Sequence, residues 1–357
     1  MSVIAAVHAV LGPHGYPQHE LTDAFASVVS PDGSNRAIIE RIHKATGVEH
    51  RYLAIPLNEY ETLTDFGATN DAFIRVGLEL TEGAVRGALE ESGLLASDVD
   101  MVMTTTVTGI AVPSIEARLI PLLGLRPDVK RLPVFGLGCV AGAAGIARVH
   151  DYLLGHPDDV AVLLSLELCS LTVQRDDDSM ANIVASGLFG DGAAAVVMVG
   201  DRRARALGIR GPEVVASRSR MYPYTERTMG WDIGGSGFRI VLSPGVADVI
   251  TDHLGADVTA FLAGHDLTPA GVSTWVCHPG GPKVLEAMES ALDLHDGQLD
   301  VTWRSLAAIG NLSSASVLHV LRDTLEGRGV EPPEVGAPGV LMAMGPGFCA
   351  ELVLLKW

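Results

Sequence analysis

The two halves of the sequence repeat one order of helical and apolar segments. ALEESGLLASDVDMVMTTTVTG aligns with FLAGHDLTPAGVSTWVCHPGG, and GLGCVAGAAGIARVHDYL aligns with AIGNLSSASVLHVLRDTL. In a third pair, FGDGAAAVVMVG and GPGFCAELVLLKW, a glycine loop precedes a last apolar run. Repeated units of this kind each bury one face against a shared core. We therefore predict two halves, residues 1–203 and 204–357, with the seam near residues 200–206.

The apolar runs inside this repeat predict strands that are covered on both faces. Strands are expected at 99–106, 132–137, 160–166, 192–199, 273–277, 306–309, 339–344 and 349–355, and helices at 81–95, 114–123, 139–154, 246–262, 282–292 and 313–325. Continuous apolar strands are typical of α/β sheets with helices on both sides. The sequence therefore predicts an α/β fold, in which sites form at the carboxyl ends of strands.

Composition excludes several classes of protein. Of 357 residues, 48% are hydrophobic and 19% charged, which excludes intrinsic disorder. A net charge of −18 disfavours nucleic-acid binding. No apolar run reaches the roughly 18 residues of a membrane span. The four cysteines contain no CxxC pair and are too few for a disulfide scaffold, and the N-terminus lacks the basic region of a secretory signal. A reducing cytosol is the expected compartment.

Three residues capable of chemistry fall at such strand ends. Cys139 lies in FGLGCVAGAAG, where a strand turns into a helix, and the helix N-terminus favours a thiolate. His278 lies in WVCHPGGPK, where two prolines and two glycines fix the backbone. Asn311 lies in AIGNLSSASV at the corresponding point of the second half. Each has an ordinary structural alternative: a buried cysteine, a structural histidine and an N-cap asparagine.

Together, these residues and their flanks resemble the type III polyketide synthases, the chalcone and stilbene synthase-like family. The resemblance covers almost the whole chain and includes GLGCVAGAAG, FGDGAAAVV, HPGGPKVLE, GNLSSASV and MGPGF, in order. It implies a thiolase-like five-layered αβαβα fold, a homodimer and an acyltransferase. Cys139 would carry the acyl starter and the growing chain, while His278 and Asn311 would hold the thioester carbonyl of a malonyl extender.

The resemblance also assigns binding residues. Phe189 and Phe238 match gatekeepers between a CoA tunnel and the reaction cavity. The cavity wall would consist of Val107, Thr108, Cys169 and Thr172, with the late loop Gly345, Pro346 and Gly347 beside the thiol. The phosphates of coenzyme A would meet Arg41, Lys44, Arg51 and Lys283, for which a solvated helix face is the ordinary alternative.

The segment MGWDIGGSGFRIVLSP looks like that of bacterial members that make alkylpyrones or alkylresorcinols from fatty acyl starters. A fatty acyl-CoA starter with malonyl-CoA extenders is therefore expected, with an acyl carrier protein as the alternative starter donor. No cofactor and no metal is predicted. A single-condensation ketoacyl-ACP synthase of the initiating type is the nearest alternative, followed by a papain-like Cys-His-Asn hydrolase and a non-catalytic thiolase-fold scaffold.

Overall fold

The structure, a computed structural model, describes residues 1–295, 297–328 and 330–357. Its main sheet has nine strands in the order β11-β12-β13-β8-β1-β7-β6-β4-β5. These strands are β1 (Ser2–Leu11), β4 (Val99–Thr106), β5 (Lys130–Phe135), β6 (Val160–Leu168), β7 (Asp191–Gly200), β8 (Glu213–Met221), β11 (Thr274–Cys277), β12 (Pro338–Gly345) and β13 (Cys349–Lys356).

The pairing in this sheet repeats between the two halves of the chain. In the first half β4 and β6 are parallel, whereas β6 with β7 and β7 with β1 are antiparallel. In the second half β11 and β12 are parallel, whereas β12 with β13 and β13 with β8 are antiparallel. The halves join through a short pairing of Ser2 and Val3 with Val214 and Glu213. The repeat expected from the sequence is therefore present in the strand order.

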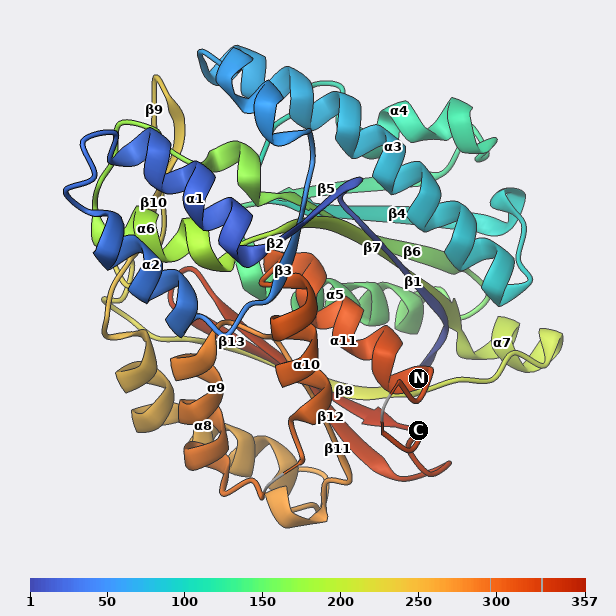
Figure 1. Cartoon of the computed structure of the whole chain (residues 1–357). Helices are drawn as coiled ribbons and strands as arrows, with labels where there is room; N and C mark the ends of the chain where they lie inside the picture. The colour runs from blue at the N-terminus through green and yellow to red at the C-terminus, as the bar shows by residue number, and fades with distance from the viewer. Residues whose placement is uncertain (296, 329) are drawn as a thin grey trace.

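Helices cover and separate the two halves of the sheet (Figure 1). They are α1 (Gln18–Val29), α2 (Arg36–Ala45), α3 (Phe66–Ser92), α4 (Ile115–Leu123), α5 (Ala141–Gly155), α6 (Met180–Leu188), α7 (Asp201–Leu207), α8 (Val246–Ala263), α9 (Pro282–Leu292), α10 (Asp300–Ile309) and α11 (Ser316–Leu325). Helices α3 and α4 pack on the first half, α8 and α9 pack on the second, and α5 and α11 lie between them.

Strand residues alternate between these layers, as a period of two requires. Val340 and Met342 of β12 pack toward α8 and α9, while Leu341 and Ala343 pack toward α5 and α11. The central helices are therefore buried on both sides, and their N-termini lie inside the molecule. This arrangement is the five-layered α/β fold expected from the sequence.

The strand predicted at 306–309 is wrong, because these residues end helix α10. Thr302, Ser305, Leu306 and Ile309 are buried, a spacing of three, four and seven residues that is helical. The helix predicted at 81–95 corresponds to the last part of the longer α3, which has Asp65 as its N-cap and ends at Ser92. The seam predicted after residue 203 falls inside α7.

Smaller elements lie around the segments that carry Cys139, His278 and Asn311. The segment MGWDIGGSGFRIVLSP forms the hairpin of β9 (Met229–Gly234) and β10 (Gly237–Leu242), and β2 (His14–Pro17) pairs with β3 (His50–Leu53). Three short 3₁₀ helices lie in the same region: η1 (Leu57–Thr62), η3 (Gly138–Val140) and η6 (Ser313–Ala315). Within the described residues, every helix is too short or too polar to cross a bilayer.

Candidate active site

Cys139 lies in η3, immediately before the central helix α5, and is 6% exposed. Close backbone packing holds it there. Gly138 has a φ of 60°, and a Cβ on it would lie 2.6 Å from Cδ of Pro346. A Cβ on Gly345 would lie 2.7 Å from the backbone nitrogen of Val140. The late loop therefore packs directly against the cysteine turn.

Asn311 enters the site from the second half, just before η6 and α11. Its Oδ1 accepts hydrogen bonds from the Ser313 backbone N–H at 2.8 Å and from the Ser316 hydroxyl at 3.4 Å. Because the amide oxygen already accepts these hydrogen bonds, the Nδ2 amide group is the part of the side chain that can bind a substrate in the cavity that Asn311 lines. The amide is thus held as a hydrogen-bond donor.

His278 follows β11, and its backbone N–H donates to the Met342 carbonyl. The ring is 2% exposed, and neither ring nitrogen has a hydrogen-bond partner among the described residues. Burial lowers the pKa of His278 to about 3, so the imidazole is neutral near pH 7. A buried neutral imidazole with both nitrogens unpaired is available to a substrate.

Cys139, His278 and Asn311 line one cavity of about 30 Å³. Phe189 and Met229 also line it, and the same two residues line a neighbouring cavity of about 30 Å³ that again includes Cys139. The structure therefore brings the three residues predicted as catalytic to one place, from opposite halves of the chain.

The thiol does not have the depressed pKa that a helix N-terminus suggests. Burial raises the pKa of Cys139 to about 12, and the nearby Glu167 carboxylate raises it further, while a hydrogen bond to the Ser313 hydroxyl at 3.6 Å opposes the rise. Burial acts on His278 in the opposite direction, and both effects favour a neutral thiol and imidazole. The expectation of a resting thiolate is corrected accordingly.

Glu167 is a buried carboxylate below this site that sequence reasoning did not assign. It accepts hydrogen bonds from Ser314 Oγ at 2.5 Å, Thr108 Oγ1 at 2.9 Å and the Val107 N–H at 3.1 Å. Burial nevertheless raises its pKa to about 7. One acidic residue within the apolar run of β6 was the signal that could have identified it, because buried carboxylates require partners.

The other wall residues divide into two groups. Val107 and Cys169 line the second cavity at Cys139, and Thr172 lines a third, of about 20 Å³, that also includes Cys169 and Phe189. The hydroxyl of Thr108 instead donates a hydrogen bond to Glu167.

Phe238 lines none of these three cavities. It packs against Phe66, Phe135 and Trp231, with ring centroids 5.3, 5.9 and 6.1 Å away. Trp231, opposite Ile240 in the hairpin, lines two of the cavities instead. Of the two residues predicted as gatekeepers, only Phe189 therefore lines these cavities, together with Trp231 and Met229.

The cationic residues predicted for coenzyme A also separate. Arg41 and Lys44 are exposed on α2, and Lys283 is exposed at the start of α9. Arg51 is 5% exposed, and its guanidinium donates to Gln18 Oε1 at 2.8 Å and to the Phe189 carbonyl at 2.9 Å. Arg51 therefore does not belong to an exposed phosphate-binding patch.

Comparisons with known proteins place the chain in a family. Residues 1–202 match the model for chalcone and stilbene synthases, N-terminal domain, and residues 213–357 match the model for their C-terminal domain. The chain belongs to the chalcone and stilbene synthases. It is therefore a type III polyketide synthase, an acyltransferase, as the resemblance implied.

Individual members of this family cover the whole length. A 1,3,6,8-tetrahydroxynaphthalene synthase of Streptomyces peucetius subsp. caesius is 56% identical over 354 residues, 99% of this chain and 93% of the relative. A phloroglucinol synthase of Pseudomonas fluorescens is 30% identical over 100% of this chain and 99% of the relative. The crystal structure of the Streptomyces coelicolor 1,3,6,8-tetrahydroxynaphthalene synthase superposes with a TM-score of 0.92, at 28% identity over 99% of both chains.

Proposed function

We propose that this polyketide synthase uses malonyl-CoA as both starter and extender and forms a polyhydroxylated aromatic product of the tetrahydroxynaphthalene type. The observation that carries the proposal is the 56% identity, over almost the whole chain, to a synthase of 1,3,6,8-tetrahydroxynaphthalene. That skeleton has ten carbons with oxygens in alternating positions, the pattern left when five two-carbon units are joined head to tail. This proposal replaces the fatty acyl starter inferred from the hairpin sequence.

The cavities at and beside Cys139 support a small starter. The two that Cys139 lines and the neighbouring third each measure only about 20–30 Å³, and bulky side chains of Phe189, Met229 and Trp231 contribute to their walls. A long alkyl chain on the thiol would require a tunnel continuous with Sγ. The small side chains of Val107 and Cys169 line the same cavity as these larger residues.

Acyl loading would couple a proton transfer to nucleophilic attack. The neutral Cys139 thiol gives its proton to an unpaired nitrogen of His278 while its sulfur approaches the thioester carbonyl. The thiolate attacks the thioester carbonyl, the bond to the CoA sulfur breaks, and the CoA thiolate takes the proton back from His278. The raised pKa of Cys139 makes the thiolate reactive but scarce, so a base in the same cavity is needed.

Chain extension would take place in the same cavity but would require stabilisation of an enolate. Loss of CO₂ from a bound malonyl thioester leaves an enolate, whose oxygen accepts hydrogen bonds from His278 N–H and Asn311 Nδ2. Neutral donors that are already oriented stabilise such an oxyanion. The enolate carbon then attacks the acyl carbonyl on Cys139, and the cysteine sulfur leaves.

Exposed residues suggest where coenzyme A binds and where two subunits meet. Arg41, Lys44 and Lys283 are exposed and form no ion pair with a described residue, so we assign the CoA phosphates to them. Strand β5 is an edge strand with exposed Leu132 and Phe135, and we propose that it lies in a homodimer interface.

Product analysis tests the proposal. With malonyl-CoA alone, we expect mass spectrometry to find a ten-carbon aromatic product, and added hexanoyl-, dodecanoyl- or coumaroyl-CoA to divert little of it. Cys139→Ala should form no product yet still release CO₂ from malonyl-CoA. A product that appears only after dodecanoyl-CoA is added would restore the fatty acyl starter and leave the condensing mechanism standing.

A further inference from the structure

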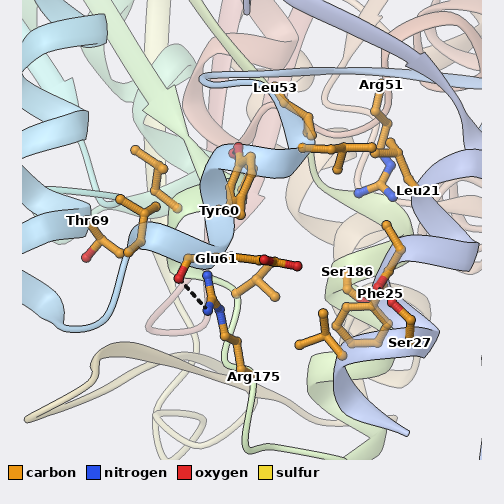
Figure 2. A pocket seen from close by; sticks show the side chains of 17 residues that line it. Leu21, Phe25, Ser27, Arg51, Leu53, Tyr60, Glu61, Thr69, Arg175 and Ser186 are labelled. Carbon is orange, nitrogen blue, oxygen red and sulfur yellow. Dashed lines mark hydrogen bonds between the residues drawn. The ribbon is translucent and has the colours of Figure 1, made fainter. Parts of the chain in front are cut away.

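A larger cavity lies outside the active site, between α1, η1 and the segment that follows β6 (Figure 2). Its volume is about 200 Å³, against about 30 Å³ for each cavity that Cys139 lines. It shares only Val173 with the cavity lined by Cys169 and Thr172, and none of its residues with the two at Cys139. The mechanism above does not use it.

The inner end of this cavity carries the buried guanidinium of Arg51. Nε donates to Gln18 Oε1 and Nη1 to the Phe189 carbonyl, whereas Nη2 donates no hydrogen bond to another described residue. Figure 2 shows this guanidinium beside Leu21, with Tyr60 across the cavity. A buried arginine is normally paired, so a guanidinium edge left open at a cavity can take an acceptor from a bound ligand.

The charges around Arg51 do not supply that acceptor. Asp191 is the nearby buried carboxylate, but its oxygens accept from the Ser170 and Ala54 backbone N–H groups and from the Ser170 hydroxyl. It forms no ion pair with Arg51 within the described part of the chain. At the mouth, exposed Glu61 is accompanied by Arg175, which donates to the Glu61 carbonyl, so the entrance is not acidic overall.

Apolar residues are the larger part of the remaining wall. Nine of the 17 lining residues are apolar, including five leucines and Phe25, and the polar ones include Ser27, Tyr60, Thr69, Ser170 and Ser186. The ligand must therefore combine one anionic or strongly accepting group with a short apolar body. A carboxylate suits a guanidinium edge, because charge-assisted hydrogen bonds of this kind are the stronger ones.

We propose that this cavity is an effector site for a small monocarboxylate with an apolar chain, held by Arg51. The same guanidinium links the cavity to the active site, because Nη1 holds the carbonyl of Phe189 and Phe189 lines all three cavities near Cys139. An anion that accepts a hydrogen bond from Nη2 shifts the guanidinium and, with it, the position of Phe189. Occupancy therefore changes turnover without competing for the thiol.

Sodium octanoate is the probe, and octan-1-ol, with the same chain and no charge, is the matched control. Calorimetry on the full-length protein should show octanoate binding at least about tenfold more tightly than octanol, the order expected for a hydrogen bond to a charged group. Carboxymethylation of Cys139 should leave octanoate binding unchanged. Equal binding of the two probes, or loss of octanoate binding after carboxymethylation, would overturn the assignment.

Two variants locate the site. Val28→Trp, at an exposed position lining the cavity, should weaken octanoate binding about tenfold or more, whereas Glu20→Trp, exposed on the same helix but outside the cavity, should not. Arg51→Met removes the guanidinium; if it folds, octanoate should lose its advantage over octanol. Octanoate should change kcat/KM for malonyl-CoA at least about twofold in the parent protein and not in Val28→Trp. Equal weakening by both tryptophans refutes the site, and binding without any effect on kcat/KM refutes the link to Phe189.

Discussion

Replacing Asn311 by aspartate tests the division of labour in the active site most sharply. Asn311→Asp keeps an oxygen where Oδ1 accepts from the Ser313 N–H at 2.8 Å, but it exchanges the Nδ2 donor for a second oxygen. The enolate then loses one of two donors. Loss of one such donor costs about 2.7–4 kcal/mol, so decarboxylation of malonyl-CoA should fall about 10²- to 10³-fold. Acyl loading of Cys139 does not use that donor and should remain within a few-fold of the parent rate.

Two measurements separate these steps. Release of CO₂ from labelled malonyl-CoA reports decarboxylation, and intact-protein mass spectrometry reports the acyl group on Cys139, with protein blocked by iodoacetamide as the blank. Asn311→Ala is the matched comparison, because it also frees the Ser313 N–H and should lower thermal stability more than the aspartate does. Decarboxylation at the parent rate in Asn311→Asp, or an equal loss of loading and decarboxylation, would refute the assigned donor role.

Three further predictions follow from burial and close packing. Because burial raises the pKa of Cys139 to about 12, its rate of alkylation by iodoacetamide should rise about tenfold per pH unit from pH 6 to 9; a plateau below pH 8 would show a stabilised thiolate. Burial raises the pKa of Glu167 from 4.5 to about 7, so its contribution to stability is complete below pH 4.5 and is lost as the pH rises through 7. The free energy of unfolding, measured in urea, should therefore fall in the parent between pH 5 and 8 but not in Glu167→Gln. The difference between variant and parent should grow by up to about 3 kcal/mol at pH 8, and the same difference at both pH values would contradict this. Gly138→Ala forces a Cβ onto Pro346 at a positive φ and should cost about 1–3 kcal/mol and most activity, whereas Gly155→Ala, which meets nothing within 4 Å, should leave the melting temperature nearly unchanged.

The sequence predicted the elements whose periodicity is set by the core. The helix at 282–292 has the bounds of α9, and the buried strands at 160–166 and 192–199 lie within β6 and β7. At 306–309 the internal repeat predicts a strand, whereas the local spacing of the buried residues is helical. The first half has β5 at the corresponding edge, but in the second half Leu306 and Ile309 continue a helical stripe.

At the site, the sequence located Cys139, His278 and Asn311 because rigid turns surround them. It could not supply their electrostatics, which depend on burial by segments distant in the chain. It also could not distinguish Phe238 from Trp231, because which hairpin residue reaches the cavity depends on how the hairpin docks. Arg51 looked like part of a basic surface helix region until β3 placed it in the interior.

The contact between Cys139 and Ser313 joins residues 174 positions apart, each at the N-terminus of a central helix from a different half. Native pairings this distant in sequence must wait until the intervening chain is ordered, so they are among the slow steps of folding. Either half on its own would hold a cysteine without oxyanion donors, or donors without a nucleophile. Recovery of acyl loading during refolding therefore reports docking of the halves, and should lag behind the return of helical circular dichroism.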